Sequence, residues 1–357
     1  MSLLALCLPL FVLLVEQIFL FTSTFISVQR NADLSAQRSL MGPTLALAKA
    51  SAALVNFNVA FLILCKCRLT IHALGGLSGL RWLRGERLTN TMHAVGGAGL
   101  LVFAMLHSIA HAVNYARVWR FGSRSLMKSG TTITGWILLV LLGSVAITAY
   151  YRPLRKRCFE LFWYTHQLSW LLCLTLSIHG AFCLLKSNSG KCSLVTSWLW
   201  LIFPIALYLC EMAVIQFRVL QSAHLVRAIV HPSRVIELQF TKKSLKYRPG
   251  QYMYVKIPKV SRLQWHPFTL TSAPHEDHCS VHINVCGNWT SRLTAALNVE
   301  FLSDGSAICK PIDRLPSIFI DGPYGGECEK MIDYDVVLAI GAGIGQTPFA
   351  SILKSLW

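Results

Sequence analysis

"MHAVGGAGLLVFAMLHSIAHAV" (residues 92–113) and "FELFWYTHQLSWLLCLTLSIH" (residues 159–179) are the two stretches that decide the fold of this chain. Each is an apolar run that carries a pair of histidines at nearly the same spacing, namely His93 and His107 in the first and His166 and His179 in the second. A third histidine of the first stretch, His111, lies one turn beyond His107. At about 1.5 Å of rise per residue in an α-helix, each pair spans ~20 Å, most of the hydrocarbon thickness of a bilayer. We interpret both stretches as membrane helices.

The two pairs of histidines indicate haem ligands. Polar side chains inside a membrane are costly and usually functional, and neutral imidazole is a common ligand of haem iron. A single such histidine fits a hydrogen-bonded core residue equally well, but four at matching spacings favour two haems stacked across the membrane. The thirteen residues from His166 to His179 leave ~140° of rotation on an ideal helix. We therefore expect a kink, a π-bulge or a tilt in the second stretch.

The composition places the chain among membrane proteins. Of its 357 residues, 54% are hydrophobic and only 14% are charged, whereas roughly a quarter is usual for soluble domains. The net charge of +17 would also suit a nucleic-acid partner, but the basic residues lie in short clusters between apolar runs. Loops beside anionic lipid headgroups account for these clusters, so we expect membrane lipid as a partner and no nucleic acid.

Six apolar runs are long enough to cross a bilayer. The first lacks a cleavage site and is long for a signal-peptide core, so we interpret it as a retained helix in which Glu16 faces other helices. Positive charges are divided too evenly between the short loops to orient the helices. The six runs are residues 3–26, 44–64, 92–113, 133–150, 159–185 and 198–217.

After Arg218 the pattern becomes that of a soluble domain. "LVRAIVHPSRVIELQF" (225–240) and "YRPGQYMYVKIP" (247–258) alternate apolar and polar residues around turns, which predicts the short strands of a small antiparallel β-barrel. "YDVVLAIGAGIGQTPFASILKSLW" (334–357) then predicts a buried strand at 336–340, a glycine turn and a helix. This arrangement favours a phosphate and the start of an α/β nucleotide-binding domain, although a glycine triplet alone also fits an ordinary turn.

Several motifs in the chain resemble the NADPH oxidases. "HPFTLTSAP" (266–274), "DGPYG" (321–325) and "GAGIGQTPFASIL" (341–353) resemble their flavin and nucleotide domains, and "FELFWYTHQL" (159–168) and "SIHG" (177–180) resemble their fifth membrane helix. The motifs occur in the family's order. The resemblance implies three parts: a bundle of six transmembrane helices with two haems over 1–220, a cytosolic FAD-binding barrel over 221–330, and the first strand and helix of an NADPH-binding domain over 331–357.

The resemblance also implies roles for the residues in the membrane. His93 and His166 would ligate an inner haem b, and His107 and His179 would ligate an outer haem b. An oxygen site would lie next to the outer haem, formed by His111 and Lys49, where a cation and a hydrogen-bond donor stabilise superoxide. Lys49 alone fits a snorkelling residue equally well, and the family typically has arginine there.

A flavin is required between NADPH, which gives a hydride, and haem, which accepts one electron. The resemblance implies that one run of residues binds FAD: His266, Pro267, Phe268, Thr269, Leu270, Thr271 and Ser272. The glycine turn and the helix after it would bind NADPH: Gly341, Gly343, Ile344, Gly345, Thr347 and Pro348.

Some positions depart from the family. Asn284 replaces an arginine expected near the FAD pyrophosphate, which predicts weaker retention of FAD. Leu172 stands where relatives often place an aromatic residue between the haems, with Trp170 as a nearby substitute. Cys183 and Cys192 flank the last outer loop, where a disulfide and two free thiols are equally supported.

The implied activity is electron transfer from cytosolic NADPH through FAD and two haems to molecular oxygen, with superoxide or hydrogen peroxide released across the plasma membrane. The implied protein partners are cytosolic regulators and a small membrane-protein helper subunit. The alternative enzyme is a ferric-chelate reductase with the same electron path. Because family members extend beyond the equivalent of Trp357, a fragment or a truncated, non-catalytic short form is a further alternative.

Overall fold

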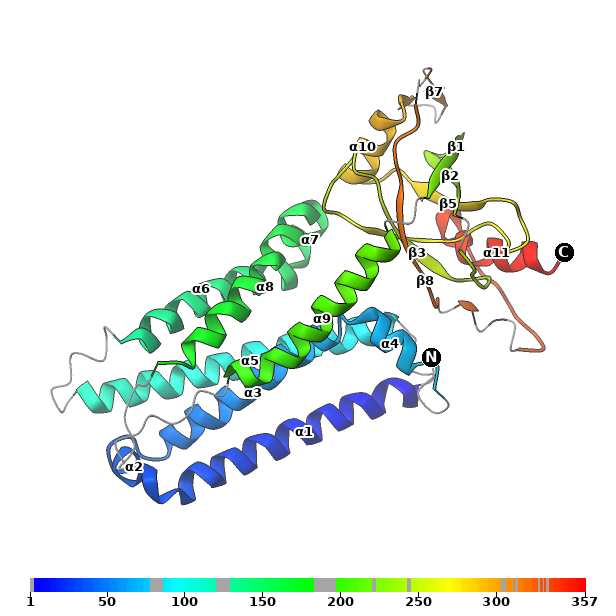
Figure 1. Cartoon of the computed structure of the whole chain (residues 1–357). Coiled ribbons are helices and arrows are strands. Elements are labelled where there is room, and N and C mark those ends of the chain that lie inside the picture. The colour runs from blue at the N-terminus through cyan, green and yellow to red at the C-terminus, as the bar shows by residue number, and fades with distance from the viewer. Residues whose placement is uncertain are drawn as a thin grey trace. The chain divides into compact units, whose positions relative to one another are not determined.

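The computed structural model describes residues 3–77, 86–119, 129–182, 197–219, 223–242, 245–302, 306–309, 311, 314–326, 328, 329, 331 and 334–357. The chain divides into two compact units, one of residues 1–67 and 88–209 and the other of residues 68–87 and 210–357. The first unit is helical, and the second contains the strands (Figure 1).

Long helices form the first unit, and some of them are joined by short ones. They are α1 (Leu3–Arg30), α2 (Ser35–Met41), α3 (Thr44–Leu64), α5 (Glu86–Trp119), α6 (Gly130–Tyr150), α7 (Arg152–Arg157), α8 (Phe159–His179) and the start of α9 (Ser197–Val219). Among the described helices, α1, α3, α5, α6 and α9 are long and apolar enough to cross a membrane. The chain is therefore a multi-pass membrane protein.

These five helices coincide with five of the six predicted spans, and the remaining span, predicted over 159–185, forms α8. α8 has 21 residues, enough to cross a bilayer. Glu160, His166, Gln167 and His179 make it less apolar than the other five. Gly180 is its C-cap, so the helix ends at His179. Cys183 and Cys192 lie outside the described residues, and the disulfide stays a prediction.

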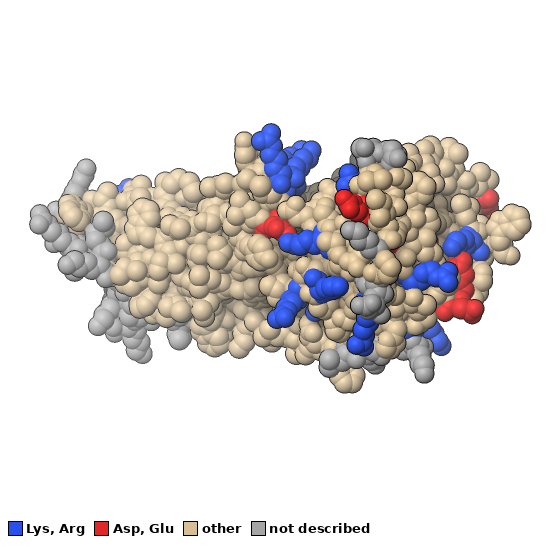
Figure 2. All heavy atoms as spheres, turned by 90° about the horizontal axis from the view of Figure 1, so that it is seen from above, with Lys and Arg blue, Asp and Glu red and all other residues tan. Residues whose placement is uncertain are grey.

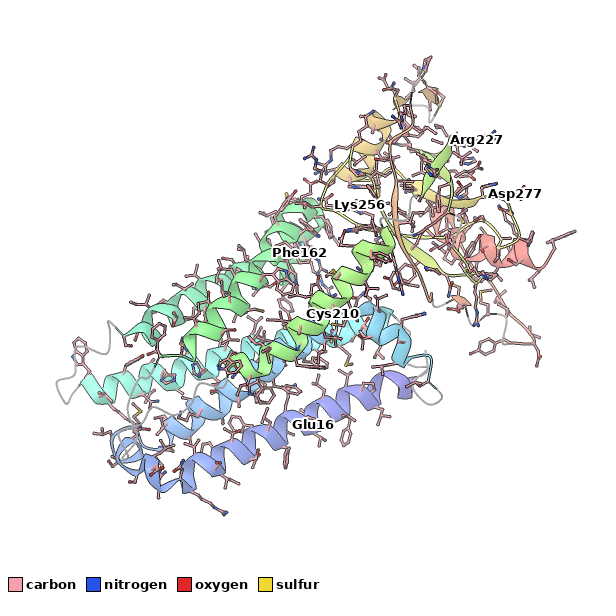
Figure 3. The ribbon with its side chains drawn as sticks, viewed as in Figure 1. Glu16, Phe162, Cys210, Arg227, Lys256 and Asp277 are labelled. Carbon is pink, nitrogen blue, oxygen red and sulfur yellow. The ribbon has the colours of Figure 1, made fainter. Side chains whose placement is uncertain are left out.

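The long helices direct large apolar side chains outward and small ones inward. Phe19 and Val140 are 69% and 67% exposed, and Figure 2 shows a broad uncharged surface over the long helices. Ala46 and Ala48 in α3 are fully buried, which lets neighbouring helices approach closely. Glu16 lies exposed on α1 (Figure 3), so the prediction that it faces other helices of this chain is wrong.

The second unit begins with the short helix α4 (Arg68–Leu74) and continues after α9 with three antiparallel sheets. Their orders are β1-β2-β5, β4-β3-β8 and β6-β7. The strands are β1 (His224–His231), β2 (Val235–Thr241), β3 (Tyr252–Lys256), β4 (His266–Thr269), β5 (Cys279–Asn284), β6 (Val299–Phe301), β7 (Ala307–Cys309) and β8 (Phe319–Tyr324). The helices are α10 (Asn288–Ala296) and α11 (Thr347–Ser355), with a 3-10 turn, η5 (Gly343–Gln346), before α11.

The two larger sheets share one apolar core, in which Ile236, Met253 and Ile283 are buried. Alternation along the strands produces this core, because every second side chain points inward. Single bridges join the two sheets at Ala223–Ile318 and Leu270–Val281. The predicted antiparallel strands are therefore present. The edge strands of the two sheets are joined by these single bridges, and a continuous closed barrel is not found among the described residues.

The strand predicted at 336–340 is not formed. Val336, Leu338 and Ile340 are 89%, 84% and 82% exposed, and the backbone there has no strand partner within the described residues. An apolar run becomes a strand only when a neighbouring strand satisfies its N–H and C=O groups, and its side chains need a second layer to be buried. The glycine turn and the helix after it form without such a neighbour, because their hydrogen bonds are local.

Candidate functional site

The structure brings the four predicted ligand histidines of α5 and α8 together in two facing pairs. His93 of α5 lies opposite His166 of α8, with 6.0 Å between the ring centroids and 61° between the ring planes. His107 of α5 lies opposite His179 of α8 at 6.3 Å and 75°. α8 is α-helical throughout, without a π-bulge or an internal proline. Of the features expected for the thirteen-residue spacing, a π-bulge and a proline kink are therefore absent from α8.

Three of these imidazoles are oriented by a hydrogen bond at Nδ1. The Nδ1 atom of His107 lies 2.9 Å from the carbonyl oxygen of Ala48, and that of His93 lies 3.3 Å from the carbonyl oxygen of Leu62. A ring nitrogen that meets a carbonyl oxygen carries the proton, so Nε2 keeps the lone pair that can bind a metal.

Thr134 of α6 orients a third ring, that of His179, in the same way. Its Oγ1 lies 2.8 Å from Nδ1 of His179 and donates its own proton to the carbonyl oxygen of Gly130 at 2.6 Å. The hydroxyl can therefore accept from Nδ1 of His179 and leave Nε2 as the ligand atom. Nδ1 of His166 is buried and has no hydrogen-bond partner among the described residues.

A large cavity adjoins the second pair. It has a volume of about 1020 Å³ and is lined by His107, His179, His111 and Lys49 among many apolar side chains. The rings of His107 and His111 are 4.6 Å apart, and the buried Nδ1 of His111 has no hydrogen-bond partner in the described part of the chain. The cavity is at the upper end of the size range of ligand pockets, and its mostly apolar wall with a few convergent polar groups is typical of one.

Leu172 lines this cavity and is 7% exposed. Trp170 does not line it, because its ring packs instead against Tyr208 with 5.0 Å between centroids. At this cavity, position 172 therefore contributes an aliphatic side chain, and Trp170 contributes no aromatic ring to the lining.

The residues predicted to bind FAD divide into two groups. His266, Phe268 and Thr269 are half-buried and Pro267 is exposed, all on β4, where the strand pairs with β3. The ring of His266 packs against Trp289 of α10 at 4.3 Å, and the buried Nε2 of His266 has no hydrogen-bond partner within the described ranges. Burial, followed by the charge of Arg292, lowers the pKa of His266 to about 4, so the ring is neutral at physiological pH.

The other three predicted residues, Leu270, Thr271 and Ser272, are 0–1% exposed. Oγ1 of Thr271 lies 2.8 Å from Oγ of Ser280 and 2.8 Å from Nδ1 of His282. Ser272 accepts a hydrogen bond from the backbone N–H of Ser280 at 2.9 Å. Their side chains fix the segment from inside, while residues 266–269 form its surface.

The glycine turn forms the exposed entrance to α11. Gly343 has φ +53°, a left-handed conformation that glycine adopts without strain. A Cβ atom at Gly343 or Gly345 would meet none of the described atoms within 4 Å, so a ligand can approach this backbone. Oγ1 of Thr347 donates to the carbonyl oxygen of Ile344 at 2.9 Å, and Pro348 lies in the first turn of α11.

An ion pair next to the "DGPYG" motif was not foreseen. The guanidinium of Arg68 in α4 lies 4.1 Å from the centroid of the Tyr254 ring and 3.7 Å from Oδ2 of Asp321. Burial raises the pKa of Asp321, and the positive charge of Arg68 opposes that rise. Because Arg68 and Asp321 are far apart in sequence, no local pattern could have paired them.

The comparisons with known proteins identify first a class. A family model described as "Ferric reductase like transmembrane component" matches residues 49–177, which include His93, His107 and His166 and end two residues before His179. A second model, "FAD-binding domain", matches residues 220–328. The chain thus has the membrane and flavin modules of the transmembrane flavoprotein reductases.

The similar whole proteins identify the family within this class. NADPH oxidase 3 of Homo sapiens is 32% identical over 406 residues, covering 95% of this chain and 70% of the human protein. NADPH oxidase 1 of Mus musculus is 31% identical over 407 residues, covering 95% of this chain and 67% of the mouse protein. A superoxide-generating NADPH oxidase heavy chain of Dictyostelium discoideum is 40% identical over 233 residues, covering 63% of this chain and 43% of that protein. The chain belongs to the NADPH oxidase family and is an oxidoreductase.

Proposed function

We propose that this chain carries electrons from cytosolic NADPH through FAD and two b-type haems to molecular oxygen. The oxygen is reduced to superoxide or hydrogen peroxide, which is released on the other side of the membrane. The facing of His93 with His166 and of His107 with His179 is the observation that carries the proposal. We further propose that residues 1–220 form the membrane domain, residues 221–330 the flavin domain, and residues 331–357 the first part of the NADPH-binding domain.

The histidine pairs have the separation that a flat, iron-centred group requires. A metal–imidazole bond of about 2 Å on each face, together with the radii of the two rings, separates the ring centroids by roughly 6 Å. The observed separations are 6.0 and 6.3 Å. When bound, haem would supply one-electron transfer, and each iron would be held by one histidine from α5 and one from α8. Ala48, Leu62 and Thr134 each meet the Nδ1 atom of one ring, which leaves Nε2 of that ring as the ligand atom.

We also propose that α8 is the sixth membrane span, which these pairs support. Each pair takes one histidine from α5, which has the length and apolarity of a span, and one from α8. The polar residues of α8 are in part the proposed ligands, which explains its lower apolarity. Six spans would put both ends of the membrane domain on one side. We propose that this side is the cytosol, because the flavin domain that follows would receive electrons from cytosolic NADPH. The proposed location is the plasma membrane, and the proposed partners are cytosolic regulators and a small helper subunit.

The cavity beside His107 and His179 is the proposed oxygen site. Lys49 and His111 line it, and both can direct an N–H group at a reduced oxygen molecule. A preorganised cation and donor in an apolar pocket stabilise developing negative charge far better than the same groups in water. Lys49 acts there as a point charge and lacks the planar fork of arginine.

The flavin and nucleotide residues fit their cofactors. His266 and Trp289 each have a buried nitrogen without a hydrogen-bond partner within the described residues, which a ligand would satisfy. His266, Pro267, Phe268 and Thr269 would contact FAD, while Leu270, Thr271 and Ser272 hold the segment in place. The backbone is open at Gly343 and Gly345. Together with Gly341, Ile344, Thr347 and Pro348 at the start of α11, these residues would receive the phosphates of NADPH.

A purified, cofactor-loaded chain tests the proposal. We expect two haems per chain and NADPH-dependent reduction of cytochrome c that superoxide dismutase abolishes. Oxygen consumption without superoxide or peroxide, together with reduction of ferric chelates, would favour the ferric-chelate reductase. Fewer than two haems per chain in a folded preparation would refute the assignment of the histidine pairs.

A further inference from the structure

Three metal-binding side chains converge on one face of the β1-β2-β5 sheet. They are His231 at the end of β1, Glu237 of β2 and His282 of β5. Glu237 and His282 are directly paired across the strands, and His231 pairs with Val235, two residues from Glu237. Residues two apart on a strand share a face, so the sheet register itself brings the three side chains together.

The distances among the three side chains fit one shared ion. Oε2 of Glu237 lies 2.9 Å from Nε2 of His231 and 3.6 Å from Nε2 of His282. Each residue offers one ligand atom, and these atoms all lie within 4.8 Å of one another. A tetrahedral ion with bonds of about 2.0–2.2 Å separates its ligand atoms by roughly 3.3–3.6 Å. Within the described residues no other group of three has this arrangement.

Glu237 and His282 each have a second polar atom, which makes a hydrogen bond to a neighbouring side chain. Nε2 of Gln239 donates to Oε1 of Glu237 at 2.8 Å. Nδ1 of His282 lies 2.8 Å from Oγ1 of Thr271. Such outer hydrogen bonds fix the orientation of carboxylate and imidazole ligands in metal sites. The rings of His231 and His282 stack with 5.2 Å between centroids and 23° between planes, so the two rings lie nearly parallel.

We propose that His231, Glu237 and His282 bind a divalent transition-metal ion of the zinc type, with water as the fourth ligand. Two imidazoles and one carboxylate suit zinc, whereas magnesium and calcium prefer oxygen ligands alone. The side chains are 38%, 12% and 26% exposed, which leaves room for water. A hydrogen bond between His231 and Glu237 does not account for His282, because 3.6 Å exceeds the length of a hydrogen bond.

The ion would connect three strands to the flavin segment. Thr271 belongs to the buried part of that segment and contacts His282. Lys354 of α11 is near enough to His282 for its positive charge to repel a proton on that ring. The ammonium of Lys354 is paired with Glu276 at 3.2 Å. An ion that binds the folded sheet stabilises it by mass action. The site is therefore a cross-link within the flavin domain, and it does not depend on the proposed electron path.

The test is zinc binding by the full chain, purified with its cofactors, stripped with EDTA, incubated with zinc chloride and desalted. We expect the wild-type chain to retain one more zinc ion than Glu237→Gln or His231→Asn, measured by elemental analysis. His224→Ala removes a histidine at the opposite end of the same strand and should retain as much zinc as the wild-type chain. Equal zinc in all four proteins would overturn the site and leave only a hydrogen-bonded cluster.

Cobalt supplies a second measurement that does not rely on a variant. Co²⁺ added to the stripped wild-type chain should give the visible absorption of a four-coordinate site, and excess zinc should remove it. The melting temperature of the second unit should rise with zinc in the wild-type chain and in His224→Ala, and not in Glu237→Gln. Cobalt spectra typical of six-coordinate, water-bound ions would contradict the proposed ligands.

Discussion

His107 and His179 face each other with their ring centroids 6.3 Å apart, although one lies in the middle of α5 and the other is the last residue of α8. Their Nδ1 atoms are held by different helices, through the carbonyl oxygen of Ala48 in α3 and the hydroxyl of Thr134 in α6. Four helices thus orient one pair of rings. Because neighbouring helices set the ring orientations, the spacing of the two histidines in α5 need not equal the spacing in α8.

Replacing His107 with alanine should halve the haem content, from two haems per chain to one. The pair of His93 and His166 remains, so the variant stays a haem protein and its remaining absorption reports a folded bundle. Haem per chain, measured as the pyridine haemochrome, checks this, and His179→Ala should behave alike. Two haems in both variants would show that this pair is not a ligand set.

Thr134→Val should weaken the binding of the outer haem without removing a proposed ligand. The hydroxyl orients His179 at 2.8 Å, and losing such an outer hydrogen bond typically costs about 10–100-fold in affinity or activity. Thr134→Ser keeps the hydroxyl and should therefore bind the outer haem as the wild-type chain does. The rate of haem loss to a scavenger protein and the midpoint potential provide the measurement, and identical values for valine and serine variants would exclude the role.

Lys49→Met should slow oxygen reduction at unchanged haem content. Removing a preorganised charge from such a site costs roughly 10²–10³-fold in rate. Lys49→Arg keeps the charge and should therefore keep most of the wild-type rate of oxygen reduction. The measurement is the superoxide-dismutase-sensitive reduction of cytochrome c by chains whose haems are fully reduced. If Lys49→Met matches the wild-type rate, the lysine is a snorkelling residue.

The stability of the flavin domain should fall with acid because of His266. Its pKa in the fold is lowered to about 4, mainly by burial, from an ordinary value of 6.5. The folded state therefore binds fewer protons than the unfolded state, and the stability present above pH 6.5 is lost progressively as the pH falls to about 4. His266→Gln should flatten the dependence of the melting temperature on pH across this window. Parallel pH curves for the two proteins would contradict the assignment.

Asn284→Arg should tighten FAD binding. Asn284 is the last residue of β5 and half-buried, and a charge-assisted hydrogen bond to the pyrophosphate is worth about 1.5–3 kcal/mol, roughly tenfold or more in affinity. Asn288→Arg adds the same charge at an exposed neighbouring position and serves as the control. Flavin fluorescence titration measures both. Equal affinities would mean that general charge, and not position 284, sets retention.

Much of the fold was predictable because it depends on local sequence. Five spans coincide with helices of spanning apolarity. The helix of the remaining span begins at Phe159 as predicted but ends at His179, before the predicted end at residue 185. The strand at 336–340 and the closed barrel were not found among the described residues, since both depend on strands that must pair elsewhere in the chain. Trp170 could not be assigned from its position next to the haem ligands, because only packing decides that it contacts Tyr208.

The sequence alone determined which segments are apolar helices, that two of them carry histidine pairs at similar spacing, and that a glycine turn precedes a helical pattern. These features are encoded within a single turn or run of residues. Only the tertiary structure decided which histidines face each other, that Ala48 and Thr134 orient them, and that His231, Glu237 and His282 converge. Such contacts join residues far apart in the chain, and the packing of whole helices and sheets, not local pattern, sets their geometry.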